Sequence, residues 1–169
     1  MTAKKIGGGK LARSETVTVR LDPKLRYLAE LAARQQRRTL SSYIEWAIEE
    51  SLNTIILKRT EDWECSLADE SFELWDVDDA DRFVKLAFKY PELLTHEEQV
   101  LWKLICECGH LWRGRYDEND EWSWIVRDDK LVIDRLRDSW ELFKSVAMGD
   151  ADKSVLPEWQ KKDPNPIPF

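Results

Sequence analysis

The alternation of polar and apolar residues is clearest at residues 16–21, Thr-Val-Thr-Val-Arg-Leu. Successive side chains of a β-strand point to opposite faces, so a period of two predicts a half-buried strand. Its apolar face comprises Val17, Val19 and Leu21, and its polar face comprises Thr16, Thr18 and Arg20.

Two helices are predicted to follow this strand. Asp22 can cap the first helix, and Pro23 suits its first position because the proline ring fixes φ at a helical value. Apolar residues then recur at steps of three and four up to about Arg37; these are Leu25, Leu28, Leu31 and Ala32.

The second predicted helix begins within a few residues of the first. Thr39, Ser41 and Ser42 each suit the N-cap, and Ser42 with Glu45 has the form of a capping box. The apolar face of this helix comprises Leu40, Ile44, Ala47, Ile48 and Leu52, and the helix is expected to continue through residues 55–57.

A single strand leaves its backbone donors and acceptors unpaired, and about 40 residues are too few to bury a core alone. The simplest partner is the same strand of a second copy, paired antiparallel above four helices. The sequence therefore predicts a homodimer that could associate further into higher oligomers. Its shared core would contain Val17, Val19, Leu21, Leu28, Ile44 and Ile48.

Residues 15–53 thus resemble the ribbon-helix-helix family of DNA-binding proteins, the Arc, MetJ and CopG type, whose β-ribbon enters the major groove. The resemblance implies that Thr16, Thr18 and Arg20 touch base edges of double-stranded DNA. Arg20 is the strongest of these readers, because a guanidinium can make a bidentate contact with guanine O6 and N7.

The same resemblance implies contacts with phosphates at the start of the second helix, where free N–H groups and hydroxyls fix the register of the ribbon. The family often has glycine in the turn between its helices, whereas this chain has two arginines. The expected phosphate-contacting residues are Arg37, Arg38, Thr39, Ser41 and Ser42.

Residues 1–14 form a predicted flexible basic arm, because lysines and arginine flank Gly7-Gly8-Gly9. One interpretation is that Lys4, Lys5 and Lys10 add phosphate or minor-groove contacts, and the other is that the arm is an inert tail.

Charge divides the chain in the same way. Its net charge is −7, yet residues 1–60 contain 12 Lys and Arg against 6 Asp and Glu, and residues 61–169 contain 14 against 27. Only the front half suits a polyanion. We expect a cytoplasmic protein with reduced thiols, because no apolar run is long enough to span a membrane, no signal peptide is evident, and three cysteines are an odd number.

Beyond a predicted linker or helix extension at 54–62, residues 63–160 contain eight of the nine tryptophans. So many large rings predict a packed, mostly helical, acidic domain, followed by a proline-rich tail at 161–169. Helices are expected at 79–90, after the capping box at Thr95 and Glu98, and at 128–147, with a short strand at 122–126. The predicted fold class is mainly α.

Motifs for chemistry are few in this second domain. Cys106, Cys108 and His110 suggest zinc, but residues two apart on a helix point to different faces, so buried cysteines are the preferred interpretation. The carboxylates of residues 76–81 suit a helix start as well as a cation or an acid–base pair. We predict no cofactor, no metal and no enzyme activity.

These features predict a homodimeric, operator-binding transcriptional regulator, acting as a repressor. Its C-terminal domain would serve oligomerisation, sensing or binding of a protein partner. One alternative is an antitoxin whose acidic C-terminal domain neutralises a basic toxin. Another is a DNA-tethered enzyme or accessory factor, which a cluster of titratable groups in a C-terminal cleft would favour.

Overall fold

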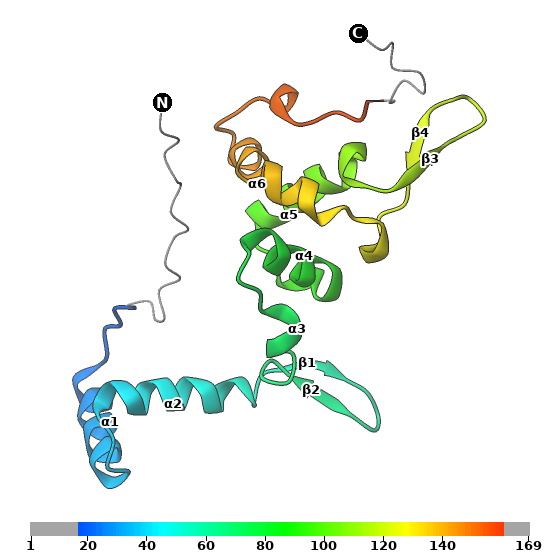
Figure 1. The fold of residues 1–169 in the computed structure, drawn as a ribbon. Coiled ribbons are helices and arrows are strands. Elements are labelled where there is room, and N and C mark those ends of the chain that lie inside the picture. Colours follow the sequence, from blue (N-terminus) through cyan, green and yellow to red (C-terminus); the bar gives the residue numbers. More distant parts are fainter. Residues whose placement is uncertain (1–16, 161–169) are drawn as a thin grey trace, which may run out of the picture. The chain divides into compact units, whose positions relative to one another are not determined.

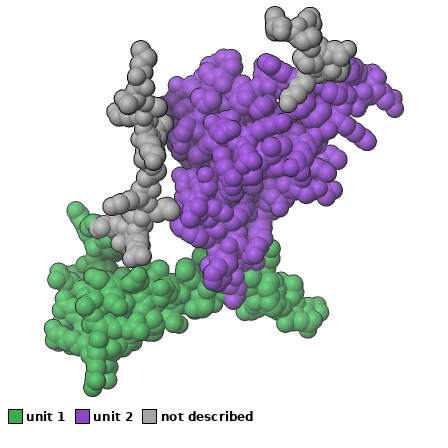
Figure 2. Space-filling view, in the orientation of Figure 1, with its two compact units in different colours: residues 1–68 green, residues 69–169 purple. Residues whose placement is uncertain are grey.

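The computed structural model describes residues 17–160, and its chain divides into two compact units, residues 1–68 and 69–169 (Figures 1 and 2). The structure is mainly helical, with two small two-stranded antiparallel sheets among the described residues. This confirms the predicted fold class at the level of helical content. No helix between residues 17 and 160 has the length and hydropathy needed to cross a bilayer.

Unit 1 contains the two helices predicted from the sequence, α1 (Pro23–Gln35) and α2 (Leu40–Leu52). Asp22 caps α1 as expected, because its Oδ1 accepts a hydrogen bond from the Lys24 amide at 2.9 Å. The start of α1 is therefore set by a local capping signal that the sequence displays directly.

The prediction that α2 extends through residues 55–57 was wrong. The helix ends at Leu52, and the chain forms a hairpin of β1 (Ile56–Arg59) and β2 (Glu64–Ser66) instead of a linker or helix extension. Leu67 donates its amide hydrogen to the Ile55 carbonyl at 2.8 Å, which closes the base of the hairpin. β-branched Ile55 and Ile56 favour a strand over a helix once a partner segment is available.

Unit 2 is built on three longer helices, with α4 and α5 both packed against α6 (Figure 1). The sequence predicted each of them, and the hairpin strand β4 falls within the predicted strand at 122–126. The helices and strands are α3 (Ser71–Leu74), α4 (Asp79–Lys89), α5 (His96–Glu107), β3 (Gly114–Tyr116), β4 (Trp122–Trp124) and α6 (Ile133–Ala147). Short 3-10 turns are η1 (Pro91–Leu93), η2 (Gly109–Leu111), η3 (Asp128–Lys130) and η4 (Lys153–Val155).

The core of unit 2 is aromatic and fully enclosed at its centre. Trp112 is completely buried, and its indole Nε1–H donates to the Ile105 carbonyl at 2.9 Å, which satisfies the only polar atom of the side chain. Trp102 contacts both Trp112 and Phe88 edge to face. Trp63 and Trp75 do not share this role, because both are more than half exposed.

One helix start in unit 2 is set by a local capping signal, and another is set by pairing with a distant segment. The capping box of α5 is confirmed, because Thr95 and Glu98 each accept a hydrogen bond from the other's backbone amide. The start of the last helix was predicted too early. Residues 128–130 form η3, and the Lys130 carbonyl accepts from the Arg113 amide at 2.7 Å, so this segment pairs with the chain before β3.

Candidate nucleic-acid interface

The segment proposed to read DNA precedes α1 and belongs to no helix or strand within the single described chain. Thr16 lies outside the described residues, and Thr18 and Arg20 are exposed. Val17 and Val19 are 80% and 64% exposed, so both the polar and the apolar side of the segment face solvent in one copy. The strand itself stays a prediction, because its proposed partner belongs to a second chain.

Both helices of unit 1 also expose apolar side chains. Ala33 is the one buried residue of α1 and α2, whereas Leu25, Leu28 and Ile48 are at least half exposed. Ile44 and Leu21 are partly buried. So many exposed apolar side chains on a helix pair this small are characteristic of an interface that another chain covers.

The turn between α1 and α2 has the backbone geometry that glycine usually supplies. Arg37 has φ 55°, in the left-handed region, and the Arg38 amide donates to the Ala33 carbonyl at 2.9 Å while the Arg37 amide donates to Arg34 at 3.0 Å. These two bonds define a Schellman motif. Arg37 therefore holds a left-handed backbone conformation that costs a residue with a Cβ more than it would cost glycine.

The start of α2 is capped by Thr39, whose Oγ1 accepts from the Ser42 amide at 3.1 Å. Of the three predicted caps Thr39 is therefore correct, and the box proposed for Ser42 and Glu45 does not form the cap. Ser41 is exposed beside it. One contact here was not predicted: the Arg38 guanidinium lies 5.4 Å from the centre of the Trp46 ring.

The proposed phosphate contacts are brought together, but the proposed base contacts lie elsewhere. Arg37, Arg38, Thr39, Ser41 and Ser42 all occupy the single turn where α1 meets α2. Arg20 precedes the other end of α1, and a helix of 13 residues is roughly 20 Å long. Lys4, Lys5 and Lys10 lie outside the described residues. One copy thus presents the residues proposed to read bases and those proposed to contact phosphate at opposite ends of α1.

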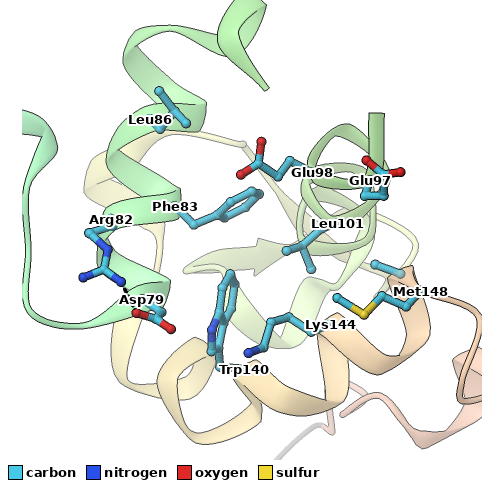
Figure 3. A pocket seen from close by; sticks show the side chains of 11 residues that line it. Asp79, Arg82, Phe83, Leu86, Glu97, Glu98, Leu101, Trp140, Lys144 and Met148 are labelled. Carbon is cyan, nitrogen blue, oxygen red and sulfur yellow. Dashed lines mark hydrogen bonds and ion pairs between the residues drawn. The ribbon is translucent and has the colours of Figure 1, made fainter. Parts of the chain in front are cut away.

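Unit 2 contains a separate pocket of about 330 Å³ between α4, α5 and α6 (Figure 3). Phe83, Leu101 and Trp140 form its apolar wall. Two of its three carboxylates are engaged in the fold, because Asp79 pairs with Arg82 and Glu98 caps α5. Such a pocket can admit a small molecule, and Glu97 is its third carboxylate.

The acidic residues 76–81 also have structural partners. Asp78 caps α4, Lys85 donates to Asp76 at 2.8 Å, and Arg137 makes a bidentate contact with Asp81 at 2.7 and 2.8 Å. The hydrogen bond from Lys85 lowers the pKa of Asp76, and the bond to Asp81 raises the pKa of Arg137. The sequence-based preference for a helix start over a cation site agrees with these contacts.

The two thiols and the histidine near the end of α5, Cys106, Cys108 and His110, are partly buried. Burial raises the pKa of Cys106 to about 11, which suppresses the thiolate needed for nucleophilic or metal chemistry. The Cys108 Sγ lies 3.2 Å from the Pro157 carbonyl oxygen. Within residues 17–160, no three His, Cys, Asp or Glu side chains are grouped so that they could hold a metal ion.

Comparison with known proteins adds no relative: no protein-family model, no curated protein and no solved structure matches the chain. The functional argument therefore depends on the residues and the geometry described above.

Proposed function

We propose that this chain is a homodimeric, sequence-specific DNA-binding regulator that represses transcription by occupying an operator. Two copies would pair residues 16–21 as an antiparallel ribbon that enters the major groove. The observation that carries the proposal is the apolar surface of unit 1, since Val17, Val19, Leu28 and Ile48 are exposed in one copy. A second copy would cover them and would complete the unpaired strand.

Charge and capping support the same assignment. The strand alternation at 16–21 leaves Thr18 and Arg20 on the side opposite the apolar surface, where a groove can receive them. The turn with Arg37 and Arg38 adds positive charge beside the N-terminus of α2, which favours a phosphate. Base recognition and anchoring would then come from separate parts of each copy.

The deciding experiment compares Arg20→Ala with Arg26→Ala in the full chain. Both variants remove one positive charge, but Arg26 lies on α1 and pairs with Glu30. Binding is measured by fluorescence anisotropy on a duplex selected by the protein from fragmented genomic DNA, and on a scrambled duplex. Loss of a bidentate base contact costs about 1–3 kcal/mol on the selected duplex and far less on the scrambled one.

Two results contradict the proposal. If Arg20→Ala lowers both affinities equally, the segment is an electrostatic surface and does not read bases. If the selection enriches no sequence at all, the chain has no operator.

The antitoxin alternative receives support from one feature of unit 2. Phe72 is 92% exposed, and Trp75 and Val77 are also exposed, on a segment rich in carboxylates. An acidic surface with protruding apolar side chains suits a basic protein partner. A stable complex with the product of a neighbouring reading frame, lost in Phe72→Ser, would favour this alternative.

A further inference from the structure

A groove of about 430 Å³ at the β3–β4 hairpin of unit 2 has a basic lining. Arg113, Arg115 and Lys130 line it together with Ser123 and Ile125, and no carboxylate contributes to its wall. This is unexpected, because unit 2 belongs to the acidic part of the chain.

The two arginines of this groove differ from the other cations of unit 2, including Lys130, which pairs with Asp129. Every other lysine and arginine between residues 69 and 160 has an ion-pair partner, or, for Arg135, the His110 carbonyl at 2.6 Å and the Trp159 ring. Among the lysines and arginines of residues 69–160, Arg113 and Arg115 alone have no ion pair and no side-chain hydrogen bond. Two guanidinium groups with unused donors therefore face the same groove.

The backbone fixes these two side chains on one side of the hairpin. Arg113 immediately precedes β3, Arg115 lies opposite Ser123 in the β3–β4 register, and both side chains line the groove. The Arg113 amide donates to the Lys130 carbonyl at 2.7 Å, which holds the third cation next to the hairpin. A Cβ on Gly114 would lie 2.3 Å from the Ser123 carbonyl oxygen, so the close strand pairing requires glycine.

We propose that this groove binds the phosphate group of a small anionic ligand. Guanidinium groups present planar pairs of N–H donors that match phosphate oxygens, and the Ser123 hydroxyl can donate a further hydrogen bond. Ile125 is 65% exposed at the groove and offers an apolar contact to the rest of the ligand. The site is separate from the DNA interface proposed for unit 1 and does not depend on it.

The surrounding charges favour a compact ligand over a nucleic-acid backbone. The turn of the same hairpin contains Asp117, Glu118, Asp120 and Glu121, and Asp129 pairs with both Arg127 and Lys130. A long polyanion would pass these carboxylates and be repelled, whereas a single phosphate or pyrophosphate contacts only the cations.

The test is calorimetric titration of the full chain with inorganic pyrophosphate, with ionic strength held constant by chloride. We expect one saturable site per chain. Combining Arg113→Gln with Arg115→Gln should weaken binding roughly tenfold or more, because charge-assisted hydrogen bonds are lost. Arg127→Gln is the matched control, since it removes a neighbouring cation that is paired with Asp129 and does not line the groove. Its affinity should stay within about twofold of the wild type.

Folding and alternatives are checked in the same series. The paired variant Arg113→Lys with Arg115→Lys keeps the charge and should restore part of the affinity, which a misfolded hairpin would not do. Absence of saturable binding, or equal weakening by Arg127→Gln, overturns the proposal. The proposal is also overturned if pyrophosphate does not bind but a random DNA duplex does, and if the log–log salt slope of DNA binding falls by about 0.9 per arginine removed. That result would assign the groove to DNA backbone, whether or not unit 1 recognises an operator.

Discussion

Replacing Arg37 by glycine should stabilise unit 1 and weaken its binding to DNA. The non-glycine residue at φ 55° costs about 1–2 kcal/mol relative to a right-handed conformation, which glycine does not pay. Glycine also makes the unfolded chain more flexible, which offsets about 0.4–1 kcal/mol of this gain. The net expectation is roughly 0.5–1 kcal/mol of added stability.

Arg37→Gln separates backbone strain from charge. Glutamine removes the same positive charge but keeps a Cβ in the left-handed region, so it should leave stability nearly unchanged. If Arg37 contacts a phosphate, both variants should reduce the log–log salt slope of DNA binding by about 0.9. Only glycine should raise stability.

The assay is native-state hydrogen exchange of the Arg38 amide, which is bonded to the Ala33 carbonyl and reports opening at this end of α1. It is measured at fixed protein concentration, because association shifts apparent stability. Equal protection in the wild type and Arg37→Gly would refute the argument from strain. Unchanged salt slopes in both variants would remove Arg37 from the proposed phosphate contacts.

Three further predictions test other parts of the structure. Val19→Asp should abolish dimerisation in sedimentation experiments, whereas Thr18→Asp, on the opposite face, should leave the dimer intact and abolish DNA binding. If both variants have the same effect, residues 16–21 do not form the proposed strand. Phe143→Ala, at a fully buried site, should cost about 3–5 kcal/mol in the urea unfolding of unit 2, against less than about 1 kcal/mol for exposed Leu142→Ala. The hydrogen bond from Lys85 lowers the pKa of Asp76 below 3.8, so this contact stabilises unit 2 above that pH and its contribution is lost as the pH falls through the lowered pKa. Asp76→Asn should therefore reduce the loss of stability on acidification. An unchanged dependence of unfolding free energy on pH would contradict this.

The elements that the sequence predicted best are those whose signals lie within one or two turns of chain. Asp22-Pro23 and the Thr95–Glu98 box place helix starts because the capping side chain and the amide it satisfies are at most three residues apart. Thr39 could not be distinguished from Ser41 and Ser42 beforehand, since all three residues offer the same hydroxyl chemistry.

The features that sequence patterns missed depend on partners distant in the chain. Residues 56–59 become a strand because residues 64–66 pair with them, although the apolar run also suited a helix. The segment at 128–130 leaves the last helix because Arg113 bonds to Lys130. The basic groove was hidden in an acidic sequence, because net charge does not show which cations have partners.

The two units also differ in the interactions that stabilise each of them. Unit 2 encloses Trp112, Phe143 and Leu136 completely, so its own side chains supply a core. The helices of unit 1 bury Ala33 alone among their described residues, and a single methyl group contributes about 0.8 kcal/mol. If unit 1 is the proposed dimer, its folding must then be coupled to association. Folding, dimerisation and operator binding would form one linked equilibrium that shifts with protein concentration, while unit 2 stays folded throughout.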